Sequence, residues 1–254
     1  MKEPKPFTKS GRPSRTYLCE ANGLKELASA GVIDVARVIS VGDTYITTEY
    51  IEHGIEKPDF FVDFGKKMAL LHRCTSPSFG FYEDNFIGAT PQLNIPDADE
   101  KGDWLTFYFR KRLLFQYQLA EKNGYVTPEM ASAFARLENK LEDILKGSEE
   151  PPCLLHGDLW SGNFLCNSSG NPVLIDPAVY YGHREADLAM TRLFGGFPEI
   201  FYEAYQQEYP LPEGWRYRED VYKLYHVLNH LNLFGAGYLH QAIRILQKYT
   251  IHPA

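Results

Sequence analysis

The stretch from Cys153 to Cys166, CLLHGDLWSGNFLC, places a histidine, an aspartate, a tryptophan and an asparagine between two apolar runs. The next apolar run, PVLID, ends in a second aspartate, Asp176. Asp158 follows the first predicted strand directly, and Asn163 comes five residues later. Polar groups at strand ends are held more firmly than groups on a free loop. The stretch therefore predicts a built chemical site rather than a loop that is polar only for solubility.

This spacing fits phosphoryl transfer. A kinase uses one carboxylate to accept or orient the proton of the attacking hydroxyl, while an amide oxygen and a second carboxylate hold Mg²⁺ against the nucleotide phosphates. Asp158 and Asn163 match the D-x-x-x-x-N spacing of protein-kinase catalytic loops, and Asp176 stands where D-F-G would begin. That triplet reads Asp-Pro-Ala, so the chain is not an ordinary protein kinase. The alternative is that these side chains only form turn hydrogen bonds; the two strands and the second aspartate favour the kinase interpretation.

Composition narrows the class of protein. The 254 residues suffice for one large domain or two lobes, and the apolar and charged fractions of 44% and 23% are those of a globular protein. A net charge of −7 argues against a general nucleic-acid or anionic-membrane surface. The four cysteines are widely spaced, which is typical of a reducing compartment, and no run has the length of a membrane span. The start of the chain lacks the apolar core of a signal peptide, so we expect a cytoplasmic protein.

The periodicity of apolar residues predicts an α+β organisation. A helix is expected over residues 16–30 and a strand hairpin over 35–51, with its turn at Gly42-Asp43. Helices are expected over 61–71 and 128–144, the second capped by Thr127, and again from Ala186 onward. Residues 81–104 look too polar and too punctuated for regular structure. Residues 164–175 form a second predicted hairpin within the helical part.

Four segments resemble the fructosamine/ketosamine kinase family, relatives of the aminoglycoside phosphotransferases: LLHGDLWSGN, LIDPAVYYGHREADLAM, LFGGFPEIFYEAY and YKLYHVLNHLNLFGAGY. The resemblance runs from about Phe7 to the last predicted helix. It implies a two-lobed protein-kinase-like fold, with a nucleotide-binding lobe over residues 1–52 and a helical lobe over 53–254 that carries the catalytic loop and the substrate site. It also implies ATP- and Mg²⁺-dependent phosphorylation of the sugar 3-hydroxyl of ketoamines, which leads to deglycation. The acceptor would be a glycated small-molecule amine or a glycated protein lysine, with no nucleic acid or membrane partner.

The resemblance also implies a role for individual residues. Asp158 would be the catalytic base and Asp187 a buried support of its loop. The remaining implied roles are phosphate contact by Lys9 with Glu20 as its partner, adenine binding at Glu49, Tyr50 and Ile51, and Mg²⁺ ligation by Asn163 and Asp176. Trp160 lies between Asp158 and Asn163, so we expect it to face the site and stack on the sugar of the ketoamine; the alternative is a core aromatic. Asn229, His230 and Asn232 match the C-terminal stretch of the family and are expected to bind the ketoamine, the alternative being plain helix packing.

One departure from the family pattern concerns the nucleotide lid. Kinases of this type place a glycine-containing hairpin before the lysine strand, whereas only eight residues precede Lys9 and none is a glycine. Either the sequence starts late or the lid is absent. Two other functions therefore stay open at this point: a phosphotransferase for another amine-bearing alcohol such as an aminoglycoside or choline, and a non-catalytic pseudokinase that binds nucleotide or ketoamine.

Overall fold

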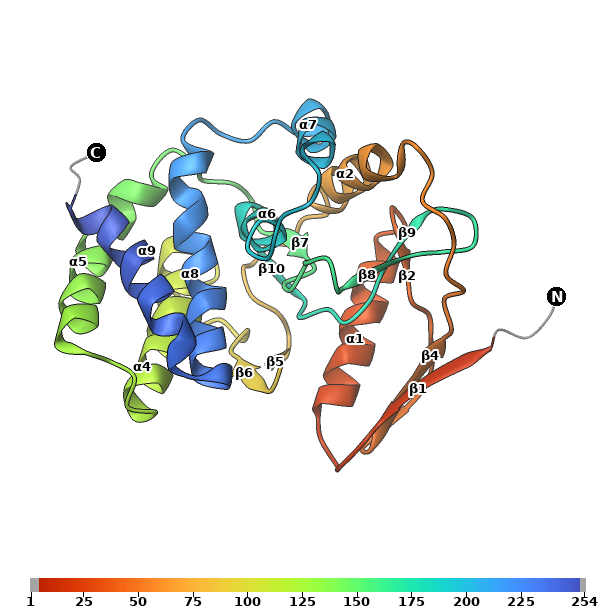
Figure 1. Ribbon diagram of the computed structural model, residues 1–254, viewed down its shortest axis with the longest axis horizontal. Helices are drawn as coiled ribbons and strands as arrows, with labels where there is room; N and C mark the ends of the chain where they lie inside the picture. The colour runs from red at the N-terminus through yellow and green to blue at the C-terminus, as the bar shows by residue number, and fades with distance from the viewer. Residues whose placement is uncertain (1–4, 252–254) are drawn as a thin grey trace.

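The computed structural model describes residues 5–251, with a small sheet-containing part and a larger helical part (Figure 1). The strands are β1 (Pro6–Ser10), β2 (Asp34–Val35), β3 (Val38–Gly42), β4 (Tyr45–Glu49), β5 (Asn85–Ile87), β6 (Thr90–Gln92), β7 (Cys153–Leu155), β8 (Phe164–Cys166), β9 (Pro172–Leu174) and β10 (Tyr180–Gly182). The helices are α1 (Thr16–Ser29), α2 (Phe60–Leu71), α3 (Trp104–Tyr108), α4 (Phe115–Lys122), α5 (Pro128–Leu145), α6 (Glu185–Thr191), α7 (Glu199–Glu208), α8 (Trp215–Phe234) and α9 (Leu239–Ile251), with a π-helical turn η1 (Phe109–Leu114) and a 3-10 turn η2 (Ala236–Tyr238).

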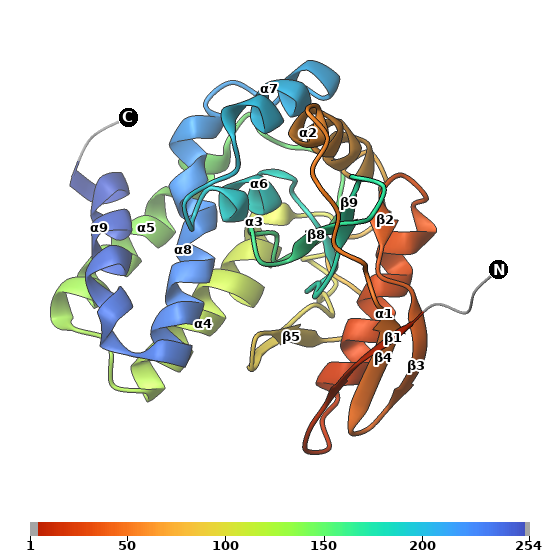
Figure 2. The ribbon, with the colours of Figure 1, turned by 45° about the vertical axis from the view of Figure 1, so that its right-hand side comes forward.

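The N-terminal sheet has the strand order β1-β4-β3 and is antiparallel throughout. The predicted hairpin is present, but its first strand starts at Val38 rather than Val35. Val35 instead pairs in parallel with Leu174 of β9, so this part of the chain joins the sheet that carries the second predicted hairpin. Helix α1 contacts both β3 and β5, and Figures 1 and 2 show it between the N-terminal sheet and the helical part.

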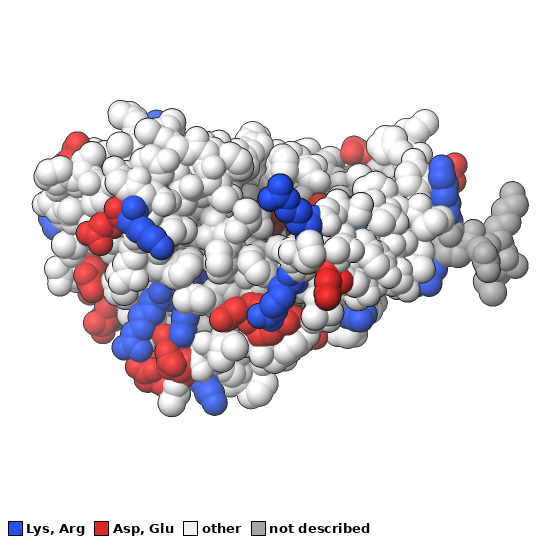
Figure 3. Space-filling model, turned by 90° about the horizontal axis from the view of Figure 1, so that it is seen from below, with Lys and Arg blue, Asp and Glu red and all other residues white. Residues whose placement is uncertain are grey.

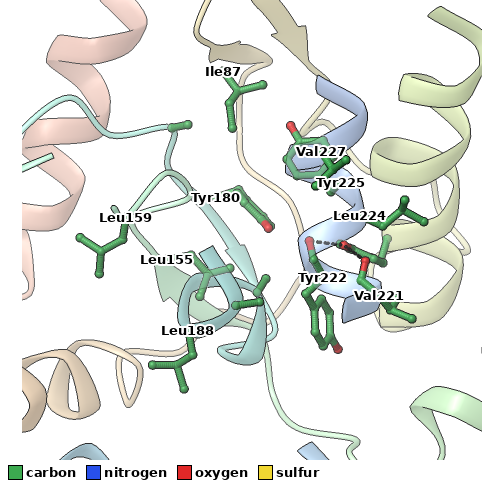
Figure 4. Packing of buried hydrophobic residues seen from close by; sticks show 14 of the residues in the cluster. Ile87, Leu155, Leu159, Tyr180, Leu188, Val221, Tyr222, Leu224, Tyr225 and Val227 are labelled. Carbon is green, nitrogen blue, oxygen red and sulfur yellow. Dashed lines mark hydrogen bonds between the residues drawn. The ribbon is translucent and has the colours of Figure 1, made fainter. Parts of the chain in front are cut away.

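The helical part is organised around α8, which contacts α4, α6 and α9. Helix α5 begins as predicted, with the Thr127 hydroxyl accepting a hydrogen bond from the Met130 amide (3.2 Å) and Pro128 at the first helical position. Figure 4 shows the core between strands and helix: Leu155 comes from β7, and Tyr222 and Tyr225 lie opposite on α8. These side chains are buried, which fixes the strands before the catalytic loop against the helices.

The prediction of irregular structure over 81–104 was wrong for residues 85–92, because β5 and β6 pair there as a hairpin. Polar side chains of this hairpin, Asn85, Thr90 and Gln92, are buried rather than solvated. The Asn85 amide donates to the Val179 carbonyl (2.8 Å), and the Gln92 amide donates to the Ala178 carbonyl (2.9 Å). Polar side chains satisfied by distant backbone stabilise this hairpin, which no local pattern of apolar residues could indicate.

Charged side chains of both signs are mixed on the surface. On the face shown in Figure 3, acidic and basic side chains lie side by side, and no broad basic surface of the kind that binds nucleic acids is seen there. Within residues 5–251, no helix combines the length and the apolar character that crossing a lipid bilayer requires.

Candidate active site

A lysine and two carboxylates meet where the N-terminal sheet faces the end of β9. Lys9 on β1 donates from Nζ to Glu20 Oε1 of α1 (3.0 Å) and also forms an ion pair with Asp176. Burial alone would lower the pKa of Lys9, but hydrogen bonds and charge from Asp176 and Glu20 raise it above its ordinary value. The lysine therefore stays positively charged and can meet a phosphate at this point.

A cavity of about 290 Å³ extends from this lysine to the end of β4. It is lined by the three residues predicted to hold adenine, Glu49, Tyr50 and Ile51, and by Lys9 itself. The Glu49 amide donates to the Arg37 carbonyl (2.9 Å) and the Tyr50 amide donates to the Lys5 carbonyl (2.7 Å), so a ligand in this region cannot use these two donors. The predicted hinge and the predicted lysine thus border one space.

The catalytic-loop residues are fixed by a short set of hydrogen bonds. The Asn163 side-chain NH₂ group donates to the backbone carbonyl of Asp158 (2.7 Å) and to Oδ2 of the Asp158 carboxylate (3.1 Å). This leaves the Asn163 oxygen for a ligand. Asp176 has φ of 53°, the one positive φ at a non-glycine position among residues 5–251. Such a conformation is uncommon and is found often at functional sites, where the rest of the structure holds it.

The backbone before Asp158 is held by a buried carboxylate. Asp187 of α6 accepts from the amides of His156 (2.7 Å) and Gly157 (2.8 Å) and from His72 Nε2 (3.3 Å). Burial alone would raise the pKa of Asp187, but the His72 hydrogen bond and charge, with the loop amides, hold it below its ordinary value. Asp187 is therefore an ionised anchor for the loop, and His72 is a part of that anchor that sequence reasoning missed.

Two further contacts explain the glycine and the histidine of the loop. Gly157 has φ of 82°, and a Cβ there would lie 2.0 Å from the Ala178 carbonyl oxygen, so the loop and the segment after Asp176 pass too close for a side chain. The His156 ring donates from Nε2 to the Ile175 carbonyl (2.9 Å), and its Nδ1 accepts from the Asp158 amide (3.2 Å). His156 is thus a structural tie between the two strand ends.

The Asp158 carboxylate lies in a poorly solvated position. Burial raises its pKa from an ordinary 3.8 to about 7, against the effect of the hydrogen bond from Asn163. A carboxylate whose pKa lies near neutrality is matched to proton transfer, because it can both accept and release a proton close to physiological pH. The raised pKa of Asp158 therefore suits a general base.

Asp158 lines two of three neighbouring cavities. The cavity beside Lys9 shares Glu20 and Asp176 with a second cavity of about 300 Å³. The second cavity shares Asp158 and Trp160 with a third of about 410 Å³. The site is therefore a row of adjacent cavities that runs from the end of β4, past the lysine and the strand-end carboxylates, to a space beyond the catalytic loop.

The third cavity holds some, but not all, of the predicted acceptor-binding residues. Trp160, Asn229 and His230 line it, and the Trp160 side chain is 37% exposed rather than packed into the core. Asn232 lies elsewhere: its amide donates to Gln116 Oε1 (2.9 Å), and its oxygen accepts from Asn123, so it joins α8 to α4. Lining residues that sequence reasoning did not assign are Ile87, Gly88, Met190, Phe194, Leu233, Phe234 and Tyr238.

The donor set beside Asp158 fits a hard divalent cation. The Asn163 side-chain oxygen and the Asp176 carboxylate supply oxygen atoms of the kind that such a cation binds, and the Asp176 side chain is 41% exposed, which leaves room for waters. Mg²⁺ prefers such oxygens and retains several waters. Together with Asp158 and the ion-paired Lys9, these are the kinds of group that a phosphotransferase of protein-kinase-like architecture uses.

Comparison with known proteins identifies the family. The fructosamine kinase family matches residues 7–252. A probable ketoamine kinase of Synechocystis sp. is 41% identical over 237 residues, covering 91% of this chain and 78% of the relative. The chloroplastic protein-ribulosamine 3-kinase of Arabidopsis thaliana is 40% identical, over 91% of this chain and 71% of its own. The chain belongs to the fructosamine kinase family.

Solved structures agree with this assignment. The crystal structure of a putative fructosamine-3-kinase from Thermobifida fusca superimposes with a TM-score of 0.89 at 32% identity, covering 98% of this chain and 86% of the other. The choline kinase LicA of Streptococcus pneumoniae has a TM-score of 0.64 at 17% identity over 99% of this chain and 88% of its own, which shows a shared fold alone. The predicted two-lobed kinase-like fold is confirmed.

Proposed function

We propose that the protein transfers the γ-phosphoryl group of ATP to the sugar 3-hydroxyl of a ketoamine, and that the phosphorylated product then releases the amine. One observation carries this proposal: Asp158 borders both the cavity that contains Asp176 and the cavity lined by Asn229 and His230. A base at that junction can reach a hydroxyl on one side and a phosphoryl group on the other. The named relatives, a probable ketoamine kinase and a protein-ribulosamine 3-kinase, support the ketoamine as acceptor.

Different residues of the nucleotide cavity would bind the adenine and the charged phosphates of ATP. Adenine would lie between the sheet and β9, with the backbone of Glu49 and Ile51 as hydrogen-bonding partners. Lys9 would contact the phosphates and Glu20 would hold its side chain in place. Residues 1–52 would then form the nucleotide-binding lobe, and residues 53–254 the lobe with the catalytic loop and the acceptor.

The transfer itself needs a proton acceptor and a charge-stabilising cation. The Asp158 carboxylate would take the proton of the attacking 3-hydroxyl as the oxygen–phosphorus bond forms and ADP leaves. Asn163 and Asp176 would hold Mg²⁺, which when bound neutralises phosphate charge. Asp187 would keep the Asp158 backbone in place throughout.

The acceptor cavity argues against a polycationic alcohol as substrate. Asp158 is the one carboxylate among the described residues that line it, and the remainder of the lining is aromatic, aliphatic or amide. An aminoglycoside carries several ammonium groups and would need more acidic partners than this cavity supplies. A sugar with a single secondary amine fits better, because its C–H face can pack on Trp160 and its ammonium can lie over the same ring.

The cellular setting follows from the thiols and the acceptor. All four cysteines are free thiols, and we propose a reducing compartment such as the cytoplasm. The acceptor would be either a glycated small-molecule amine or a glycated lysine of a protein.

The experiment is a steady-state comparison of acceptors with the purified protein and MgATP. ADP production should depend on a fructosamine or ribulosamine of an amino acid, and should be near background with kanamycin or choline. Preference for kanamycin or choline would contradict the ketoamine assignment. MgATP binding by calorimetry without turnover of any acceptor would favour the pseudokinase alternative instead.

A further inference from the structure

A row of aromatic rings leads away from the catalytic loop. The ring centroid of Trp160 lies 6.1 Å from that of Phe194, and Phe194 lies 4.9 Å from His230. His230 in turn lies 5.3 Å from Phe234 and 5.2 Å from Tyr238. We call these five residues the aromatic row. Such contact distances are those of interacting aromatic pairs, so the row is a continuous apolar surface.

Three separate parts of the chain build this row. Trp160 comes from the catalytic loop, Phe194 from the segment after α6, and the other rings from the end of α8 and the turn η2. Gly235, with φ of 90°, ends α8 and lets the chain turn so that Tyr238 packs back on His230. Phe234 is 68% exposed, so the row is apolar surface at its outer end and not core.

The row and the catalytic base border one space. All five rings line the cavity of about 410 Å³ that also contains Asp158. The described residues that line it include no lysine or arginine. Burial lowers the pKa of His230, against the effect of the hydrogen bond that its Nδ1 donates to the His226 carbonyl (2.7 Å), so this ring adds no fixed positive charge to the cavity at neutral pH. The cavity is thus acidic only at Asp158, and apolar and neutral toward Phe234.

We propose that the outer part of the row, Phe194, Phe234 and Tyr238, binds the substituent on the amine of the ketoamine and favours acceptors whose amine carries an aromatic or bulky apolar group. This inference rests on the proposed function. The attacked hydroxyl must lie at Asp158, which puts the sugar beside Trp160. The rest of the same cavity then receives the substituent, whose ring can pack on the exposed Phe234.

The test uses two acceptors that share a sugar and differ only in the amine: N-(1-deoxyfructosyl)glycine and N-(1-deoxyfructosyl)phenylalanine. The parent enzyme should have a kcat/KM about 2- to 12-fold higher for the phenylalanine derivative, the range expected for one added aromatic contact. Phe234→Ala should remove that preference, because it should lower kcat/KM for the phenylalanine derivative by more than it lowers kcat/KM for the glycine derivative. Phe234→Tyr keeps a ring and should retain the preference.

A matched control is Ile200→Ala, which removes an exposed apolar side chain from α7, outside this cavity. It should leave both acceptors unchanged. Equal kcat/KM for the two acceptors in the parent, or an equal loss for both in Phe234→Ala, would overturn the inference and leave the kinase activity standing. Phosphorylation of neither acceptor would instead contradict the proposed function. Self-association of the parent that Phe234→Ala abolishes, with acceptor preference unchanged, would assign the row to a second copy of the chain.

Discussion

Replacing Asp187 by asparagine should loosen the catalytic loop and lower both stability and turnover. The carboxylate accepts the amides of His156 and Gly157 on different oxygens. Asparagine has one side-chain oxygen, so one of these buried amides would face an NH₂ group instead. A buried donor without an acceptor costs about 1–3 kcal/mol. For a chain of this size, each kcal/mol shifts the thermal midpoint by roughly 2–4 °C, so we expect a decrease of about 2–12 °C.

The same change should reduce catalysis in the protein that remains folded. The two amides directly precede Asp158, and a displacement of about 1 Å at a reacting group can cost around 10²-fold in rate. We therefore expect kcat to fall by about 10- to 100-fold below the melting transition, measured beside the control Asp99→Asn, which alters an exposed partner of Arg110. A parent-like kcat together with a clear loss of stability would refute the link between Asp187 and the base.

The pH dependence of stability offers a second readout for Asp187. Its pKa is below the ordinary aspartate value, so its contribution to stability is fully present above that ordinary value and is lost as the pH falls through the lowered one. The difference in thermal midpoint between parent and Asp187→Asn should therefore shrink in strong acid. A difference that stayed constant through that range would contradict the ionised state assigned to Asp187.

Four further predictions concern the site. Asp158→Asn should lower kcat by roughly 10²–10⁴-fold, because the amide cannot accept the hydroxyl proton. Its thermal midpoint should be equal to or higher than that of the parent, because burial disfavours the charge that the variant removes. Turnover within a few-fold of the parent would exclude the role of base. Since burial raises the pKa of Asp158 to about 7, kcat/KM of the parent should decline as the pH falls below about 7, where the base becomes protonated, and a flat profile would count against it. Asp176→Ala should weaken MgATP binding in calorimetry more than Asn163→Ala, since a carboxylate supplies charge as well as an oxygen; equal affinity in Asp176→Ala and the parent would remove it as a ligand. Trp160→Ala should reduce kcat/KM for the ketoamine by roughly 2- to 30-fold with little effect on the KM for ATP, and, at 37% exposure, with little loss of stability; a large fall in thermal midpoint with an unchanged ketoamine KM would defeat the stacking interpretation.

The sequence could predict the parts of the site that lie close together along the chain. Asp158, Asn163 and Asp176 lie within one strand–loop–hairpin unit, so their spacing alone indicated that they converge. Helix α5 could also be predicted from the sequence, because its cap and the spacing of its apolar residues are local features. Lys9 is far from these residues in the sequence, so their spacing could not predict that it lies beside them. The resemblance to the kinase family did predict it.

Other parts depend on partners that a local pattern cannot indicate. The β5–β6 hairpin is held by the buried amides of Asn85 and Gln92, whose acceptors lie beyond Asp176, so its polar composition suggested a solvated loop. The sequence predicted Val35 as part of the hairpin because β propensity does not specify a pairing partner; in the structure Val35 pairs with β9. Asn232 shares a motif with His230 but points to α4, since side chains two positions apart on a helix do not face the same way.

The most direct test of the account is the mass and position of the product formed from MgATP and a ketoamine. The account predicts that N-(1-deoxyfructosyl)glycine or its ribulosyl counterpart gains one phosphoryl group on the oxygen at carbon 3 of the sugar, that free glycine appears afterwards, and that Asp158→Asn forms neither product. Phosphate found on another oxygen, or ATP turnover that leaves every ketoamine unmodified, would contradict it.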